Sequence, residues 1–427
     1  MNSRAIAAKC IFKVIKQRVS LDSALENLDP QSKDYAFIKE LCFGTLRWYH
    51  RLNKISDQLL LSPLPQKHTD ILCLLLIGLY QIIYLNTPSH AAVSETVAAT
   101  RELKKSWASA LINKTLRKYL EQHKIIQKIL EPIEEAYFSH PQWLIDELRK
   151  AWPQDYKSIL KENNQRAPMT LRVNTQLIAR DEYLKLLPEE SLPKLTEAIE
   201  LRDAISAQKL PGFTSGQSYI QDLAGQLAAH FIKPAANQRV LDACSAPGSK
   251  TTHILQLQSD LKELVALDIS DKRLTQLSEN LKRLRFNTNS IKLIAADASD
   301  LEAWWDGELF DSVLLDAPCS GTGVIRRHPD IKILRQKSDI QNQSELQAKL
   351  LKVLWPLIKP GGHLLYSTCS ILPVENEDQI SRFIDSHSDA QNISLNCDWA
   401  HPLKYGIQIF PGDNNADGFY YALMQKV

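Results

Sequence analysis

The feature that most constrains this 427-residue chain is the pattern after Gly216, where short apolar runs alternate with helical stretches. Five runs have the length and composition of strands. Between the second and third, leucines recur at helical spacing, so one face of a helix can pack on a sheet. This alternation is typical of a mostly parallel sheet and predicts a doubly wound α/β fold. The predicted strands are 239–243, 263–269, 291–297, 310–317 and 363–369, and a closing hairpin is expected in 410–427.

The front of the chain has a different pattern. Helical periodicity runs through the first 130 residues or so without strand-like alternation. Pro132 and Pro141 mark a boundary, and the stretch that follows mixes helical pattern with a strand-like run at 169–174. We therefore predict three regions. They are an all-helical domain (1–140), a small mixed α/β connecting region (141–215) and the α/β domain (216–427).

Charge is unevenly distributed along the chain. The formal net charge is only +2, but residues 1–140 have a net charge of +6 and the remainder −4. A basic front half hints at an anionic partner such as a nucleic acid. A solvated helical surface explains it equally well.

Two further features indicate where the chain works. The longest apolar run, 71–85, is shorter than the ~18 to 20 residues that span a bilayer, and it contains Gly78 and Gln81. It predicts a buried helix and no membrane segment, and basic residues interrupt the first 25 residues, so they do not form a signal peptide. The seven cysteines contain no C-x-x-C pair, which argues against both a metal site and a disulfide framework and favours the reducing cytoplasm.

The turn after the first predicted strand, "LDACSAPGSKT" (241–251), lies where ligands bind in such folds. A phosphate-binding loop would need glycines at the positions of Cys244 and Ser249, and a dinucleotide fingerprint would need more than the single Gly248. Both absences favour a nucleoside ligand without a pyrophosphate. The candidate turn residues are Cys244, Ser245, Ala246, Pro247, Gly248, Ser249 and Lys250.

Aspartates close the next strands. Asp268 follows Gly248 by 20 residues, where an acidic side chain would meet ribose hydroxyls, and Asp297 is placed to bond an adenine amino group. Each aspartate alone is more often a helix cap or loop residue. Together with Asp316 they place three carboxyl groups at one rim, which favours a site.

Cysteines follow two of the predicted strands, Cys319 in "SVLLDAPCSGTG" and Cys369 in "LLYSTCSILPVEN". A cysteine at the end of a buried strand is usually an inert small hydrophobe, and we interpret Cys10, Cys42, Cys73 and Cys397 in this way. The matched settings of Cys319 and Cys369 favour a chemical role.

Three stretches carry a resemblance to a known family. "DACSAPGSKT" (242–251), "LDAPCSGTGVIRRHPDIK" (315–332) and "YSTCSILPVENE" (366–377) resemble the signatures of S-adenosylmethionine-dependent RNA 5-methylcytosine methyltransferases. "PSHAAVSETV" (88–97) and "LINKTLRKYL" (111–120) resemble the NusB-like extension of the bacterial members that act on small-subunit ribosomal RNA. The resemblance covers nearly the whole chain. One departure is Ser249, where the family usually has a second glycine.

The resemblance implies roles for individual residues. S-adenosylmethionine would lie on the 244–250 turn with Asp268, Asp297 and Asp316. Cys369 would be the nucleophile that adds to carbon 6 of cytosine, because carbon 5 alone is a poor nucleophile. Cys319 would assist release, and Asp316 would bond the N3 edge of the ring. The motif by itself leaves the nucleophile open, since DNA cytosine methyltransferases use the cysteine of their Pro-Cys pair, which would be Cys319.

Basic residues have two expected roles. Lys250 would orient groups at the junction, and Arg326, Arg327 and Lys332, which directly follow the Cys319 motif, would hold phosphates near a flipped base. A solvated loop explains these three equally well.

The function expected from the sequence is cytosine carbon 5 methylation of small-subunit (16S) ribosomal RNA by a monomer without a metal. One alternative is a cytosine methyltransferase that acts on transfer RNA, which the catalytic half does not exclude. Another is a non-catalytic RNA-binding or antitermination factor. Two thiols and three rim aspartates argue against it, because binding alone requires neither.

Overall fold

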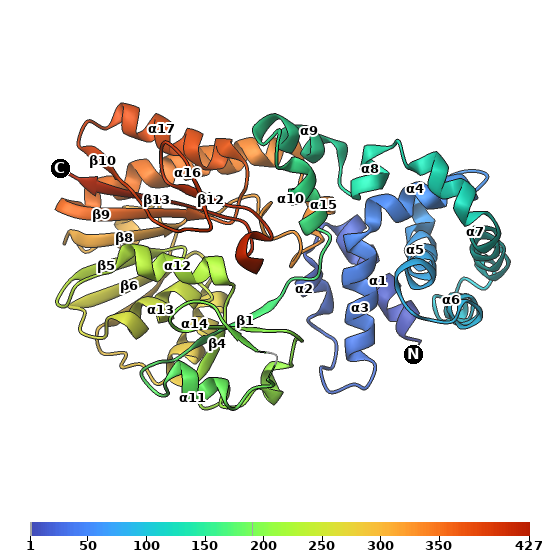
Figure 1. Ribbon diagram of the computed structural model, residues 1–427, viewed down its shortest axis with the longest axis horizontal. Coiled ribbons are helices and arrows are strands. Elements are labelled where there is room, and N and C mark those ends of the chain that lie inside the picture. The colour runs from blue at the N-terminus through green and yellow to red at the C-terminus, as the bar shows by residue number, and fades with distance from the viewer. Residues whose placement is uncertain (1, 190) are drawn as a thin grey trace. The chain divides into compact units, whose positions relative to one another are not determined.

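The computed structural model describes residues 2–189 and 191–427, which form two compact units (Figure 1). The helical unit comprises residues up to Gln165 together with Ile325–Lys337, and the α/β unit comprises Arg166–Val324 and Ser338–Val427. The chain therefore passes between the units three times, after residues 165, 324 and 337. The division into 1–140, 141–215 and 216–427 stays a prediction.

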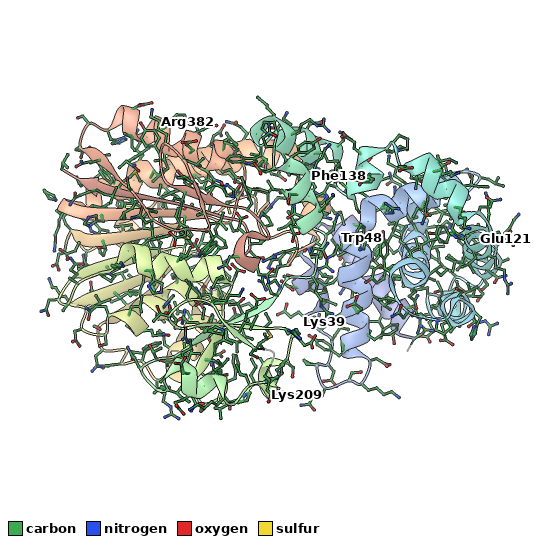
Figure 2. All side chains as sticks on the ribbon, in the orientation of Figure 1. Lys39, Trp48, Glu121, Phe138, Lys209 and Arg382 are labelled. Atoms are coloured by element: carbon green, nitrogen blue, oxygen red, sulfur yellow. The ribbon has the colours of Figure 1, made fainter. Side chains whose placement is uncertain are left out.

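The helical unit is built around α5 (Thr69–Tyr84). Leu74, Leu75 and Leu76 are fully buried in its core. Gln66–Tyr84 is the one helical stretch of the described residues that is long and apolar enough to cross a membrane, but 61% of its apolar window is buried inside the protein. Its composition is thus that of a core helix. At the end of α5, the Tyr84 ring stacks on Trp48 with ring centroids 4.5 Å apart. Trp48 is labelled on the helical unit in Figure 2.

The other helices of this unit pack on α5 or on one another. They are α1 (Ser3–Gln17), α2 (Leu21–Leu25), α3 (Tyr35–Arg47), α4 (Tyr49–Leu59), η1 (Gln66–His68), α6 (Ser89–Glu102), α7 (Ala108–Leu130), α8 (Glu134–Phe138), α9 (Gln142–Ala151), α10 (Tyr156–Glu162) and α15 (Ile331–Leu334).

The segment 325–337 is part of the helical unit although it follows Cys319 in the sequence. Lys332 is 2% exposed, and its Nζ donates to Arg47 O at 2.9 Å, Ser139 O at 3.0 Å and Asn164 Oδ1 at 2.5 Å. The prediction that Lys332 holds an RNA phosphate is therefore wrong, because its buried Nζ already donates to three protein oxygens. Arg326 is likewise 2% exposed, which contradicts the same prediction for its side chain, and Arg327 is half-buried.

The α/β unit begins with a four-stranded antiparallel sheet of order β2-β3-β1-β4. Its first strand is the predicted run at 169–174. The other strands have two to four residues and lack enough alternation to be recognised in the sequence. The elements are β1 (Met169–Val173), α11 (Arg180–Leu184), β2 (Leu192–Pro193), β3 (Ala198–Leu201), η2 (Ala207–Lys209) and β4 (Ser218–Ile220).

A nine-stranded sheet follows, of order β11-β12-β13-β9-β8-β5-β6-β7, with β10 paired to β13. All five predicted strands are present, and β5 to β9 are parallel to one another. The expected closing hairpin begins earlier than predicted, because β13 pairs with β12, which ends before residue 410, and with β9. The strands are β5 (Arg239–Ala243), β6 (Glu263–Asp268), β7 (Ile291–Ala295), β8 (Phe310–Asp316), β9 (Ile358–Thr368), β10 (Ala390–Ile393), β11 (His401–Pro402), β12 (Ile407–Ile409) and β13 (Phe419–Lys426).

Helices cover both faces of this sheet, as a doubly wound fold requires. Val240 and Leu314 belong to a core shared with α12, α13 and α14, whereas the neighbouring Leu241 and Leu315 belong to a core shared with α16 and α17. The predicted leucine face lies on α14. The helical elements are α12 (Leu223–Ile232), α13 (Ser249–Leu257), α14 (Asp271–Arg283), η3 (Leu301–Ala303), α16 (Lys337–Leu354), η4 (Trp355–Leu357), η5 (Pro373–Glu375), α17 (Glu377–Ser386) and η6 (Asp413–Asn415).

Strand order places the site. From β5 the chain proceeds outward to β6 and β7 on one side and then to β8 and β9 on the other. The order therefore reverses between β5 and β8, and ligands of such sheets bind beyond the carboxyl ends of the strands at this switch point.

Candidate active site

The turn between β5 and α13 is shaped by residues with left-handed backbone. Cys244 has φ 62° and Gly248 has φ 97°. A Cβ on Gly248 would meet Leu277 Cδ1 at 2.1 Å, so this position requires glycine. The amide of Ser245 donates to Leu267 O at 2.9 Å, which ties the turn to β6. The buried Ser245 Oγ has no hydrogen-bond partner among the described residues, so it can bond a ligand.

Asp268 ends β6 at the same rim and is 2% exposed. Its carboxylate accepts from the amides of Ala246 at 3.1 Å and Ser270 at 2.9 Å, and from Arg273 Nη2 at 2.6 Å. The backbone of the turn and the second strand are thus joined through this one side chain. A carboxylate has about four acceptor positions, so ribose hydroxyls could share them or replace the half-exposed Arg273.

Asp297 lies two residues beyond β7 and is exposed. Its Oδ1 accepts from the amide and the hydroxyl of Ser299, both at 2.8 Å, and these bonds lower the pKa of the carboxyl group. Within the described residues, no side-chain hydrogen bond reaches its other oxygen.

Asp316 ends β8 and faces Lys250 from the first turn of α13. Lys250 Nζ donates to Asp316 Oδ2 at 2.6 Å, and Ser367 Oγ donates to Asp316 Oδ1 at 2.8 Å. Burial opposes a charged Lys250, but the charge of Asp316 outweighs it, so the pKa of Lys250 lies above its ordinary value. Three neighbouring strands thus meet at one charged pair.

The two predicted thiols lie side by side. Cys319 Sγ and Cys369 Sγ are 3.4 Å apart, and both residues are half-buried. The amide of Gly323 donates to Cys369 O at 2.9 Å, which fixes the two loops against each other. The hydrogen bond with Cys369, burial and the nearby charge of Glu375 raise the pKa of Cys319 well above its ordinary value. The electrostatic interaction with Cys369 is among the smaller causes that raise the pKa of Lys250.

Three buried polar residues around the site were missed in the sequence. Asp242 within β5 accepts from Thr251 Oγ1 at 2.6 Å, and burial raises its pKa to about 7. Arg172 in β1 donates to Ser249 O at 2.6 Å and to Thr252 Oγ1 at 2.8 Å. Glu375 lies beneath both cysteine loops. Asp242 and Arg172 lie within strands, where the alternation of the sequence predicts apolar side chains. A charged residue inside an apolar run was the one signal in the sequence that pointed to them.

The Arg172 guanidinium supports the first helical turn of α13, the helix that follows the 244–248 loop. It is fully buried, and burial lowers its pKa to about 9. Its Nε also donates to Gln256 Oε1 at 3.1 Å, so two successive turns of α13 are held from the small sheet.

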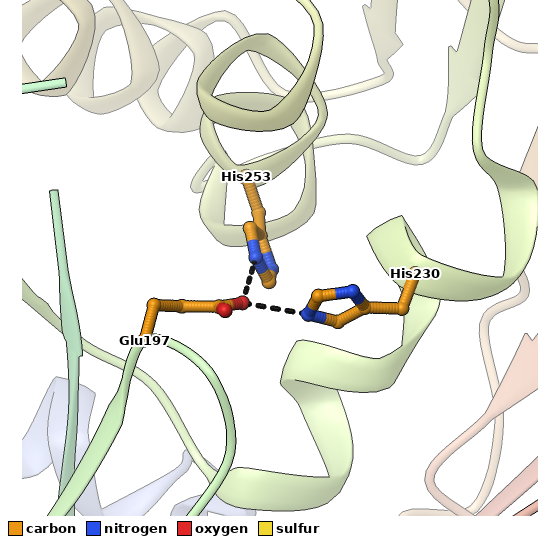
Figure 3. Close-up of side chains that lie close together, drawn as sticks. All are labelled: Glu197, His230 and His253. Carbon is orange, nitrogen blue, oxygen red and sulfur yellow. Dashed lines mark hydrogen bonds and ion pairs between the residues drawn. The ribbon is translucent and has the colours of Figure 1, made fainter. Parts of the chain in front are cut away.

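One cluster has residue types that hold metals. Glu197 Oε1 lies 2.7 Å from His230 Nε2 and 2.5 Å from His253 Nε2 (Figure 3). Ligands around a tetrahedral zinc ion at about 2.0 to 2.1 Å would be about 3.3 Å apart, so these shorter distances are those of hydrogen bonds. Burial and then the charge of Arg172 lower the pKa of His253 to about 3, which favours a neutral imidazole that donates to Glu197. The cluster joins β3 to α12 and α13.

Comparison with known proteins explains this arrangement. Residues 229–425 match the family described as 16S rRNA methyltransferase RsmB/F, residues 1–121 match the NusB family, and residues 140–208 match the RsmF/B-like ferredoxin-like domain. A "Probable ribosomal RNA small subunit methyltransferase B" of Coxiella burnetii is 47% identical over the full length of both chains. The Pseudomonas putida "Ribosomal RNA small subunit methyltransferase B" is 42% identical over 100% of this chain and 99% of its own.

The chain belongs to the 16S rRNA methyltransferase RsmB/F family. The predicted fold class and the NusB-like front are confirmed with it.

Solved structures share the RsmB/F architecture. The crystal structure of PH0851 has a TM-score of 0.83 at 22% identity and covers 100% of this chain and 99% of its own. NSun6 from Pyrococcus horikoshii, solved with SFG, has a TM-score of 0.60 at 22% identity and covers 67% of this chain and 98% of its own. At these identities the likeness concerns the fold.

S-adenosylmethionine is the methyl donor of the RsmB/F family, and the residues present fit it. The buried Ser245 Oγ, the other oxygen of Asp297 and the buried carboxylate of Asp268 surround one turn that lacks the glycines of a pyrophosphate site. Such a set suits a nucleoside with a charged tail.

Proposed function

We propose that this protein methylates carbon 5 of a cytosine in 16S ribosomal RNA through a covalent adduct with Cys369. The observation that carries the proposal is the 3.4 Å contact between the sulfurs of Cys319 and Cys369, beside the ion pair of Lys250 and Asp316. S-adenosylmethionine, when bound, supplies the methyl group. The turn at 244–250, Asp268, Asp297 and Asp316 would hold it.

The asymmetry between the thiols supports the division of their roles. Cys319 holds its proton more tightly than an ordinary cysteine and can donate it in a hydrogen bond to the sulfur of Cys369. Cys369 has this donor on one side and the positive Lys250 nearby. A hydrogen-bond donor and a cation are the kinds of neighbour that assist an attacking sulfur.

The reaction then follows from these groups. The Cys369 thiolate forms a bond to carbon 6 of cytosine, and the displaced electron pair makes carbon 5 nucleophilic. After carbon 5 takes the methyl group, its proton passes to solvent, the carbon 5–carbon 6 double bond reforms, and the bond between sulfur and carbon 6 breaks. The departing sulfur accepts the hydrogen bond of Cys319. Asp316, held by Lys250 and Ser367, would bond the N3 edge of the ring.

The wider setting belongs to the same proposal. The target would be an unpaired cytosine, since a base must leave its stack to reach the thiol. The helical unit, whose residues 1–140 have a net charge of +6, would bind RNA phosphates. The enzyme would act in the cytoplasm as a monomer.

Single cysteine substitutions test the proposal. With 16S ribosomal RNA and S-adenosylmethionine, Cys319→Ala should accumulate a protein–RNA species that survives denaturing electrophoresis, because release is impaired after the adduct forms. Cys369→Ala should give neither adduct nor 5-methylcytosine. Cys397→Ala, which alters another half-buried cysteine, is the matched control and should remain active. The opposite pattern would assign the attack to Cys319, and an active Cys319→Ala/Cys369→Ala enzyme would exclude covalent catalysis.

A further inference from the structure

Glu375 is a buried carboxylate within the acidic stretch that follows Cys369. It ends η5 and is fully buried, unlike its exposed neighbour Asp378. Within the part of the chain that the structure describes, it has no ion pair. A buried carboxylate without a cation is costly unless hydrogen bonds satisfy it. The donors around Glu375 therefore indicate what the charge is used for.

Those donors come from both cysteine loops. Ser320, next to Cys319, donates its amide to Oε1 at 2.8 Å and its hydroxyl to Oε2 at 2.5 Å. Ser370, next to Cys369, donates its hydroxyl to Oε2 at 2.6 Å. Gln347 of α16 adds a bond to Oε1 at 3.2 Å and donates also to Pro318 O at 2.9 Å. One carboxylate thus joins the residues that follow the two thiols.

The hydroxyls around Glu375 also contact one another. The hydroxyls of Ser320 and Ser370 lie 3.3 Å from each other, and Thr322 Oγ1 lies 3.2 Å from each of them. Three hydroxyls in a ring can rotate into several hydrogen-bond patterns. A carboxylate accepts only, so it forces Ser320 and Ser370 to donate toward Oε2 and selects one pattern. Thr322 can then accept from the amide of Ile371 at 3.1 Å.

The charge of Glu375 also acts on the thiols. It is one of the groups that raise the pKa of Cys319, after the hydrogen bond with Cys369 and burial. On the other side, Lys250 is the cation near Cys369. A negative charge behind one sulfur and a positive charge near the other favour a single arrangement of the shared proton.

We propose that Glu375 is a positioning residue for methyl transfer, whose carboxylate orders the Ser320 and Ser370 hydroxyls and so fixes the contact between the sulfurs of Cys319 and Cys369. The inference rests on the cysteine roles proposed above. In the described part of the chain, the Glu375 carboxylate makes no hydrogen bond to either thiol, and it acts through the loops that present them.

The test is Glu375→Gln in the full chain, since glutamine keeps the shape but replaces one acceptor with a donor. We expect kcat to fall by roughly 10- to 100-fold, because small displacements of reacting groups lower rates by such factors. The affinity for S-adenosylmethionine should change less than about twofold, because the 244–250 turn is untouched. Asp378→Asn, in the same acidic stretch but exposed, is the control and should match the wild type.

A second readout separates positioning from general damage. The rate of iodoacetamide alkylation, followed by mass spectrometry at each cysteine across pH, reports the ionisation of each thiol. In Glu375→Gln the Cys319 profile should shift to lower pH, because a negative charge has been removed. A kcat within about twofold of wild type, or an unmoved Cys319 profile, would overturn the inference. If Glu375→Gln does not fold, Ser370→Ala decides in its place, by the same loss of kcat or its absence.

The two proposals fail differently. An active Cys369→Ala enzyme would remove the proposed nucleophile whatever Glu375 does. An inactive Cys369→Ala enzyme together with a fully active Glu375→Gln enzyme would overturn only the role of Glu375.

Discussion

Lys250 Nζ lies 2.6 Å from Asp316 Oδ2, and this ion pair joins the turn after β5 to the end of β8. Lys250 is 8% exposed, so its charge depends on Asp316 for compensation. Asp316→Asn would leave a buried ammonium, and Lys250→Met would leave a carboxylate beside the thiols. Each change should lower methyl transfer by roughly 100-fold, as removal of one preorganised polar group from an active site does. Each should also destabilise the fold, because one charge of the pair is left without its partner.

The pair also predicts non-additivity. Each single variant leaves one charge without its partner, whereas the double variant Lys250→Met/Asp316→Asn removes both charges. The double variant should therefore lose less activity than the product of the two single losses. Transfer of a labelled methyl group to ribosomal RNA measures all three. Losses that simply multiply would mean that the two residues act independently.

Asp268 should govern affinity for the methyl donor. Asp268→Asn removes the charge and one acceptor from a group that bonds the amides of Ala246 and Ser270. We expect S-adenosylmethionine binding to weaken by roughly 1 to 3 kcal/mol, the cost of unpaired buried polar groups, measured by titration calorimetry. Asp271→Asn, exposed at the start of α14, is the control. Equal affinity in Asp268→Asn and wild type would rule out the ribose contact.

Asp242 should make stability depend on pH. Burial raises its pKa from 3.8 to about 7 in the folded protein, so the folded state keeps a proton that the unfolded chain releases at lower pH. The stabilisation is full below about pH 4 and is lost as pH rises through about 7, at about 1.4 kcal/mol per pH unit. Asp242→Asn lacks this loss. The melting temperature of the variant relative to wild type should therefore rise between pH 5 and pH 8. A constant difference would mean that Asp242 is ionised in both states.

Lys332 should show the opposite dependence. Burial, and then the charge of Arg47, lower its pKa well below 10.5 in the helical unit. The unfolded chain therefore binds more protons, and stability from this residue increases as pH rises toward 10.5. The melting temperature of wild type minus that of Lys332→Met should grow between pH 6 and pH 9. Lys128→Met, at an exposed position of α7, should show no such trend.

The sequence predicted those features that depend on local pattern. Predicted runs of five to eight residues located β5, β6 and β8 almost to the residue, and the strand ends then brought Asp268, Asp316 and Cys369 to one rim. The contact between the cysteines follows from β8 and β9 being parallel neighbours.

What escaped prediction depends on partners far away in the chain. Lys332 has the composition of a solvated basic loop, and only its contact with Ser139 and Asn164 makes it a buried residue. Glu375 likewise belongs to an acidic stretch whose composition predicts exposure to solvent. It is buried instead, and its carboxylate accepts a hydrogen bond from Ser320, 55 residues earlier. No local periodicity encodes such pairings.

The segment Ile325–Lys337 has a consequence for how this protein could have been assembled. Its residues follow Cys319 directly, yet they complete the core of the N-terminal helical unit. The helical unit is therefore not a prefix that a single recombination event could add or remove. A lineage that lost it would also need new residues shortly after Cys319, one of the two thiols proposed to react. The middle of the chain is thus tied to the helical unit at its front.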